Sequence, residues 1–166
     1  MVMAIETERG QTSLEHEKVL MSSLESFYRS QGKNRTFPKT RRDKYAAIDG
    51  MIVEDGVVIG IYESKCRFFN KAALHYQFND EYLIGHDKIV SGLKMSKDLY
   101  VPFYALIYLV YEPVIFIHQI SNESGEAIVE MEVKKTKTQA SMNGGVAYRE
   151  NAFIPIKSAL EFPVIL

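Results

Sequence analysis

The stretch Val57-Val58-Ile59-Gly60-Ile61-Tyr62-Glu63-Ser64-Lys65 has the pattern of a buried β-strand that ends in charged residues. Successive side chains of a strand point to opposite faces of its sheet, so Glu63 and Lys65 share a face with the apolar Ile61. An unpaired charge is costly to bury. The acid and the base at this strand end therefore require a partner or a function.

A second apolar stretch, residues 45–53, precedes this strand and carries an aspartate in Ile48-Asp49-Gly50. The two stretches are separated by Glu54-Asp55-Gly56, and Asp-Gly is a strong signal for a tight hairpin turn. We therefore expect two antiparallel neighbouring strands, with Asp49 within reach of Glu63.

The composition is that of an ordinary globular protein. The chain has 166 residues, 46% of them hydrophobic and 25% charged, with a net charge of −1. This length predicts a single domain over residues 13–166, preceded by a tail over residues 1–12. The fold class expected is α/β (α+β mixed sheet), with a central mixed β-sheet flanked by helices.

The cellular setting is predicted from absences in the sequence. The single Cys66 excludes an internal disulfide and fits a reducing compartment. The polar, acidic start does not resemble a signal peptide, and the apolar run 101–120 is interrupted by Glu112, Pro113 and His118. We expect a cytoplasmic protein with no membrane partner.

The first helix is predicted over residues 13–30, because apolar residues recur there at helical spacing. Glu17 falls near the middle of the apolar arc, whereas Glu15 projects outward and Glu25 lies at the edge. The other expected elements are a polar connector (31–44), a short helix (70–78), a loop or brief strand (81–85), a helix (87–99), strands (103–111, 114–120, 127–133 and 152–156) and a turn (143–145).

Two carboxylates converging beside an ammonium group suit metal-assisted hydrolysis. Mg²⁺ prefers oxygen ligands and commonly takes one or two protein carboxylates, which Asp49 and Glu63 supply; Mn²⁺ is an alternative. Lys65 can orient a water molecule or stabilise developing negative charge. Glu17 is a candidate for a second metal or its water, and Ser64 is counted among the candidate ligands. This is the chemistry of phosphodiester hydrolysis.

These residues resemble the PD-(D/E)XK nuclease superfamily, whose core runs from a helix to a strand with Asp and then to a strand with Glu-x-Lys. Here Ile48-Asp49-Gly50 replaces Pro-Asp. The resemblance implies a restriction-endonuclease-like core over roughly residues 13–156, similar to small resolvase-like or phage-type members, which often dimerise. It also implies that Asp49, Glu63 and Lys65 form the metal-binding and catalytic set, with Glu17 as the helix acid.

A second Glu-x-Lys, Glu132-Val133-Lys134, provides an internal comparison. Residues 102–131 contain no aspartate, and no turn couples this copy to a strand that carries one. We interpret it as a solvated strand end. The prediction at Glu63 therefore rests on Asp49, the Asp-Gly turn and Glu17 rather than on the motif.

A basic connector precedes the Asp49 segment. Its cations and one on the later helix are candidate contacts to nucleic-acid phosphates: Arg35, Lys39, Arg41, Arg42, Lys44 and Lys88. A solvated loop would look the same.

The leading hypothesis is a Mg²⁺-dependent deoxyribonuclease. An ion pair at a sheet rim remains the alternative for Glu63 and Lys65. The alternative function is a non-catalytic nucleic-acid or protein-binding module on the same fold, and an RNA nuclease would differ only in substrate.

Overall fold

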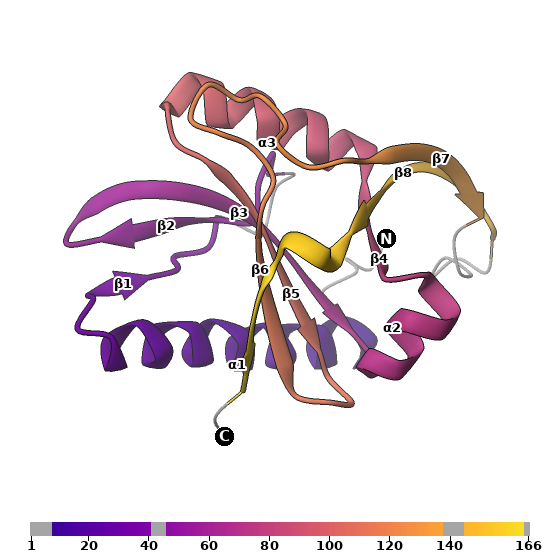
Figure 1. The fold of residues 1–166 in the computed structure, drawn as a ribbon, viewed down its shortest axis with the longest axis horizontal. Helices are drawn as coiled ribbons and strands as arrows, with labels where there is room; N and C mark the ends of the chain where they lie inside the picture. Colours follow the sequence, from indigo (N-terminus) through magenta and orange to yellow (C-terminus); the bar gives the residue numbers. More distant parts are fainter. Residues whose placement is uncertain (1–7, 41–45, 138–144, 165–166) are drawn as a thin grey trace.

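A six-stranded mixed sheet forms the centre of the structure, a computed structural model that describes residues 8–40, 46–137 and 145–164 (Figure 1). Its strands follow the order β1-β2-β3-β5-β6-β9. β3 and β5 are parallel, and the other neighbours are antiparallel. The bounds are β1 (Arg35–Thr36), β2 (Gly50–Glu54), β3 (Val57–Arg67), β5 (Phe103–Leu109), β6 (Val114–Gln119) and β9 (Leu160–Pro163).

A smaller antiparallel sheet lies beside the first, in the order β4-β8-β7. It consists of β4 (Glu81–Gly85), β8 (Tyr148–Pro155) and β7 (Glu132–Lys137), and the short 3₁₀ helix η2 (Ile156–Ser158) follows β8. One face of this sheet, with Ile84 and Ala152, is buried in the main core. Its other face is therefore free to form the wall of a cleft. The fold is thus a mixed α/β arrangement with a central sheet flanked by helices, as predicted from the sequence.

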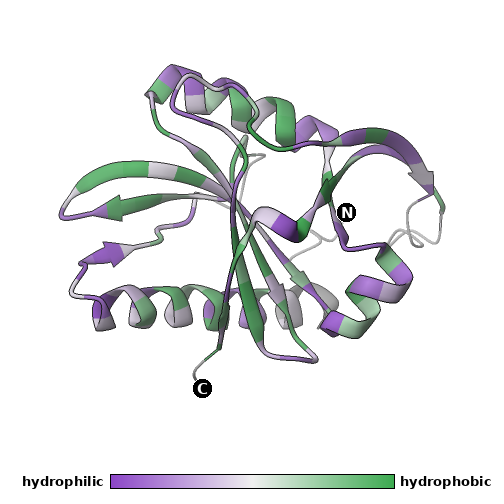
Figure 2. Cartoon of the chain, in the orientation of Figure 1, coloured by the Kyte–Doolittle hydropathy of each residue, from purple (hydrophilic) through white to green (hydrophobic). Residues whose placement is uncertain are grey.

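Helices cover the two faces of the large sheet. α1 (Glu8–Ser30) packs Leu20 and Leu24 against the face that carries Tyr62. α3 (His86–Leu99) covers the opposite face, and a Cβ at Gly92 would overlap the ring of Phe103. This close approach places the first turn of α3 beside β3. Hydrophobic residues concentrate on the central strands between the helices (Figure 2).

The predicted hairpin is confirmed. β2 and β3 pair antiparallel, and the turn between them has φ of 50° at Asp55 and 79° at Gly56. Positive φ at both positions is the type I′ geometry that Asp-Gly favours. The predicted strand over residues 45–53 is corrected: β2 begins at Gly50, so Asp49 precedes it, although the Asp49 N–H still donates to the Tyr62 carbonyl (3.0 Å).

The short helix predicted over residues 70–78 is α2 (Lys71–Phe78), where the Asn70 side chain accepts a hydrogen bond from the Ala73 N–H. The helix expected over 87–99 and the strands over 103–111 and 114–120 are also present as α3, β5 and β6. Strand 152–156 lies within the longer β8.

Three other boundaries differ from the prediction. α1 starts at Glu8 rather than at residue 13, and the connector 31–44 contains β1. The strand expected over 127–133 is wrong, since β7 covers Glu132–Lys137. Val129 and Met131 are apolar because they pack against the core rather than because they belong to a strand. The predicted turn at 143–145 cannot be compared, because residues 143 and 144 lie outside the described residues.

No described helix is both long enough and apolar enough to cross a membrane.

Candidate functional site

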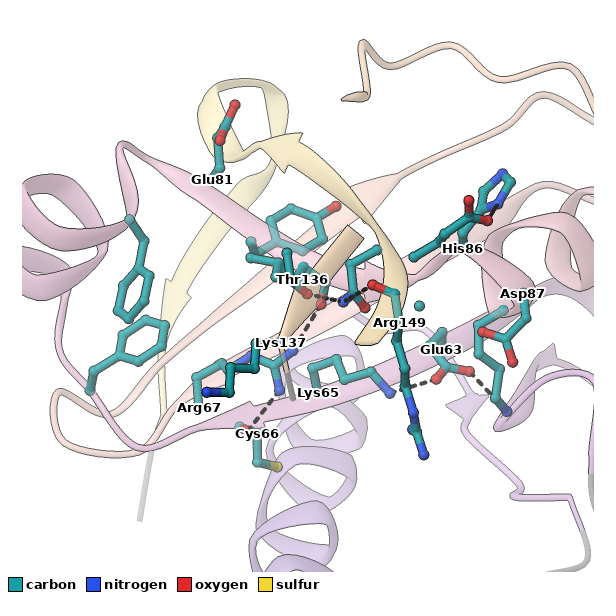
Figure 3. A pocket seen from close by; sticks show the side chains of 18 of the residues that line it. Glu63, Lys65, Cys66, Arg67, Glu81, His86, Asp87, Thr136, Lys137 and Arg149 are labelled. Atoms are coloured by element: carbon teal, nitrogen blue, oxygen red, sulfur yellow. Dashed lines mark hydrogen bonds and ion pairs between the residues drawn. The ribbon is translucent and has the colours of Figure 1, made fainter. Parts of the chain in front are cut away.

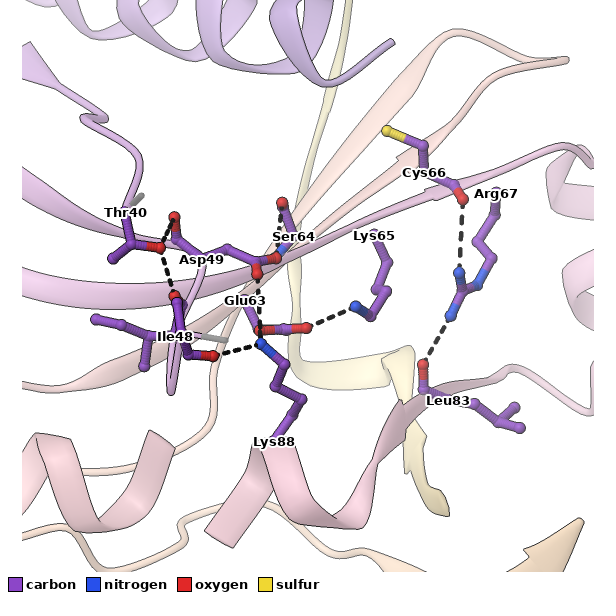
Figure 4. Close-up of polar contacts among 11 residues, drawn as sticks. Thr40, Ile48, Asp49, Glu63, Ser64, Lys65, Cys66, Arg67, Leu83 and Lys88 are labelled. Carbon is purple, nitrogen blue, oxygen red and sulfur yellow. Dashed lines mark hydrogen bonds and ion pairs between the residues drawn. The ribbon is translucent and has the colours of Figure 1, made fainter. Parts of the chain in front are cut away.

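The site begins where β2 leaves the edge of β3. The β2 register ends at Tyr62, and beyond it no strand of the described residues pairs with β3 on this side, so the Ser64 N–H needs another acceptor. The Asp49 side chain provides it: Oδ2 accepts hydrogen bonds from the Ser64 N–H (3.0 Å) and the Ser64 hydroxyl (3.1 Å) (Figure 4). Asp49 is therefore held at the strand edge by two hydrogen bonds, and Ser64 positions it.

Glu63 lies on the opposite face of β3 from Cys66 and is almost completely buried, with 1% of its side chain exposed. Lys65 Nζ donates to Glu63 Oε1 at 2.6 Å. The other oxygen, Oε2, is the one buried side-chain N or O atom of the described residues without a hydrogen-bond partner. A buried carboxylate oxygen is thus left available beside the Glu-x-Lys pair.

Lys88, from the first turn of α3, lies within ion-pair distance of both acids. Its Nζ lies 3.7 Å from Asp49 Oδ1 and 3.5 Å from Glu63 Oε2, and donates to the Ala46 carbonyl at 2.9 Å (Figure 4). The two carboxylates thus face one ammonium group, consistent with the expectation that Asp49 lies within reach of Glu63. Lys88, predicted as a phosphate contact, is directed toward these carboxylates instead.

The two acids have opposite pKa shifts. Burial is the largest influence on Glu63 and raises its pKa, an effect that Lys65 reduces and the Asp49 charge reinforces. Burial acts on Asp49 in the same direction, but Lys65, the Ser64 hydrogen bonds and Lys88 together outweigh it and lower the Asp49 pKa. Neighbouring carboxylates whose pKa values are pushed apart are typical of functional sites.

Glu17 is half-buried on α1, as the apolar arc predicted, but it forms an ion pair with Lys39 at 2.8 Å. Its charge also acts on Cys66, whose pKa is raised to about 12 mainly by burial and further by Glu17. Glu17 therefore lies toward the β3 face opposite Glu63. Across the described ranges, no group of three or more His, Cys, Asp or Glu side chains is arranged to hold a metal ion.

The predicted basic connector is only partly described. Arg35 pairs with Glu54 at 3.0 Å and lies over the ring of Tyr28, and Lys39 pairs with Glu17. Neither side chain pairs with Asp49 or Glu63, although the Lys39 backbone forms a bridge with Gly50, the residue after Asp49. Arg41, Arg42 and Lys44 lie outside the described residues.

A cleft of about 1300 Å³ runs along β3 from this site (Figure 3). Its walls come from β3, β4, β7, β8 and the start of α3, and Glu63, Lys65 and Lys88 line one part of it. The sequence interpretation missed Arg67 and Arg149, which also line it. The sequence could have indicated Arg67, because it continues the alternation that places Glu63 and Lys65 on one strand face. No sequence pattern indicated Arg149.

The second Glu-x-Lys copy forms an exposed pair at the start of β7. Lys134 Nζ lies 2.8 Å from Glu132 Oε2, and their side chains are 45% and 66% exposed. This confirms that the copy is a solvated strand end, and it makes Glu132 and Lys134 matched controls for Glu63 and Lys65.

The chain places, in order, α1, Asp49 directly before β2, Glu-x-Lys on β3, α3 and then β5 parallel to β3. No family model, no curated protein and no solved structure matches this chain. The function is therefore inferred from the geometry of the site.

Proposed function

We propose that the protein is a Mg²⁺-dependent nuclease that hydrolyses phosphodiester bonds in DNA. The observation that carries the proposal is Glu63 Oε2, a buried oxygen without a hydrogen-bond donor that shares the Lys88 ammonium with Asp49 in the wall of a cleft. An unsatisfied buried polar atom costs about 1–3 kcal/mol. Such a cost is expected where the oxygen serves as a ligand.

The residues present fit a magnesium ion. Mg²⁺ keeps several waters and usually takes one or two carboxylates together with substrate phosphate oxygens, so Asp49 and Glu63 would be sufficient to hold it. Mn²⁺ takes the same type of ligand. When bound, such a cation polarises a phosphoryl oxygen and lowers the pKa of a coordinated water.

The other side chains of the site have separate tasks. Lys65 faces the cleft with 26% of its side chain exposed, so its ammonium can stabilise negative charge on a phosphoryl oxygen. Ser64 fixes the orientation of Asp49 through two hydrogen bonds. For Glu17 to act as an accessory acid, it would have to leave Lys39.

A cleavage assay on labelled oligonucleotides tests the proposal. Single-stranded, duplex, flap and four-way DNA, together with an RNA strand, are incubated with Mg²⁺, with Mn²⁺ or with EDTA. Cleavage should require the metal and should be lost in Asp49→Asn and Glu63→Gln but retained in the matched control Glu132→Gln. A folded wild-type protein that cuts none of these substrates would contradict the proposal.

One observation favours a non-catalytic binding module as a second candidate. Lys65 and Lys88 together already compensate the charges of Asp49 and Glu63, so the cluster is electrostatically balanced without a metal. This candidate predicts salt-sensitive nucleic-acid binding that survives Asp49→Asn and is not accompanied by metal-dependent cleavage.

A further inference from the structure

Arg67, which lines the cleft and follows Glu63 and Lys65 on β3, carries a charge that no carboxylate of the described residues compensates. Its guanidinium donates to the Leu83 carbonyl at 2.8 Å and more weakly to the Cys66 carbonyl at 3.5 Å. Both acceptors are neutral, and no carboxylate of the described residues lies within ion-pair distance of it. Burial lowers the pKa of the Arg67 guanidinium, yet arginine remains charged. A partly buried cation with only neutral partners favours an anion.

Arg149 reaches the same cleft from the small sheet. The strand register gives this sheet two distinct faces, since paired residues on neighbouring strands share a face. The part of one face that carries Tyr82, Ile84, Ala152 and Ile154 is buried in the core, and the other face contributes to the cleft wall. The cleft-lining residues of that second face are Glu81, Leu83, Gly85, Thr136, Arg149 and Asn151.

The acids near these two arginines have other partners. Glu150 pairs with His86 at 3.6 Å. The pKa of Lys134 is raised mainly by its hydrogen bond to Glu132, and the charge of Glu81 adds to the effect, so Glu81 lies near Lys134. Among the described residues, no carboxylate pairs with the Arg149 side chain. Two guanidinium groups on different elements therefore line one cleft, and neither has an anionic partner in the part of the chain that the structure describes (Figure 3).

We propose that Arg67 and Arg149 form a phosphate-binding subsite, which holds the nucleic-acid backbone at a distance from the Asp49–Glu63 pair. Guanidinium groups match phosphate oxygens with two parallel hydrogen bonds. Glu63 and Arg67 are four residues apart on β3, which corresponds to about 13 Å along the strand. At about 3.4 Å per nucleotide along a duplex, Arg67 would hold a phosphate several nucleotides from the carboxylates.

This inference rests on the proposed function for the identity of the ligand as nucleic acid, but it concerns binding, so it is tested in EDTA, where no cleavage occurs. Fluorescence anisotropy measures the affinity of single-stranded and duplex oligonucleotides between about 50 and 200 mM salt. Arg149→Gln should weaken binding about tenfold, the value of one charged hydrogen bond. It should also reduce the slope of log affinity against log salt concentration by about one.

Lys135→Gln is the matched control, because Lys135 is an exposed cation on the same small sheet that does not line the cleft. Equal losses in Arg149→Gln and Lys135→Gln, or no measurable binding by the wild-type protein, would overturn the subsite. Arg67→Gln removes the carbonyl contacts and is interpreted only if its melting curve matches that of the wild type.

Oligonucleotides with and without a 5′-phosphate identify the source of the phosphate. A wild-type preference for the phosphorylated strand that Arg149→Gln loses assigns the subsite to a strand end, and equal wild-type affinities assign it to an internal phosphodiester. The two proposals fail separately: binding in EDTA without cleavage in Mg²⁺ contradicts the nuclease and leaves the subsite intact.

Discussion

Lys88 Nζ lies 3.5 Å from Glu63 Oε2, a buried oxygen that has no hydrogen-bond donor. The ammonium compensates the Glu63 charge without forming a hydrogen bond to this atom. Because Lys88 is also 3.7 Å from Asp49 Oδ1, it occupies the place between the two acids where a cation is expected. A metal ion bound by these acids would therefore compete with Lys88.

Lys88→Gln should tighten metal binding and weaken the metal-free fold. Removing the competing charge leaves two carboxylates with Lys65 as their remaining close cation, so the dissociation constant for Mn²⁺ should fall about tenfold, which is about 1.4 kcal/mol. The free energy of unfolding without metal should drop by about 2–4 kcal/mol, since buried Glu63 loses compensation. Calorimetric titration and urea unfolding measure the two effects, and an unchanged metal affinity would contradict competition.

Lys65→Ala should abolish most cleavage at a modest cost in stability. Removing an ammonium that stabilises developing charge should lower the single-turnover rate about 100-fold or more. Lys65 is partly exposed and Lys88 stays near Glu63, so the loss in unfolding free energy should be about 1–2 kcal/mol. Lys134→Ala, from the exposed copy of the motif, should change neither quantity appreciably. A large loss of stability with normal cleavage would identify the Glu63–Lys65 contact as a structural ion pair.

Glu17→Gln distinguishes an accessory metal ligand from a structural acid. Because Glu17 is paired with Lys39 and lies toward the other face of β3, its removal should change Mn²⁺ affinity by less than about twofold and stability by at most about 1 kcal/mol. Asp49→Asn should weaken Mn²⁺ binding at least about tenfold. Comparable losses of affinity in both variants would assign Glu17 to the proposed metal site.

Local features of the chain were predictable from the sequence. The Asp55-Gly56 turn brings β2 and β3 together over a few residues, so the placement of Asp49 beside β3 follows from local chemistry. α1 and α3 were predicted because each carries an apolar stripe at helical spacing. The exposed Glu-x-Lys copy at Glu132 could be distinguished from the copy at Glu63 only by the residues around it.

The features that depend on distant contacts were not predictable. Lys88 meets the carboxylates only because α3 packs closely on β5 at Gly92, so the sequence, which marked Lys88 as a phosphate contact, gave no reason to place it between the two acids. β7 has no apolar alternation, since all but one of its residues are exposed, so its pairing with β8 left no sequence signal. The pairing of β7 with β8 builds one wall of the cleft and places Arg149 in it, so neither could be predicted from the sequence.

The buried His118 should make stability depend on pH. Its Nδ1 lies 2.7 Å from the Tyr82 hydroxyl and its Nε2 lies 2.6 Å from the Ser158 hydroxyl, and burial lowers its pKa below the ordinary value of 6.5. Above the unfolded pKa the imidazole is neutral in both states and contributes no pH dependence. As the pH falls below 6.5, the unfolded chain binds a proton that the folded chain resists, so stability decreases.

Urea unfolding from about pH 8 to about pH 5 measures this effect, and the slope from one such group approaches about 1.4 kcal/mol per pH unit. His118→Gln should reduce the slope below pH 6.5, whatever its effect on absolute stability. A slope that is the same in His118→Gln and the wild type would assign the acid sensitivity to the carboxylates instead.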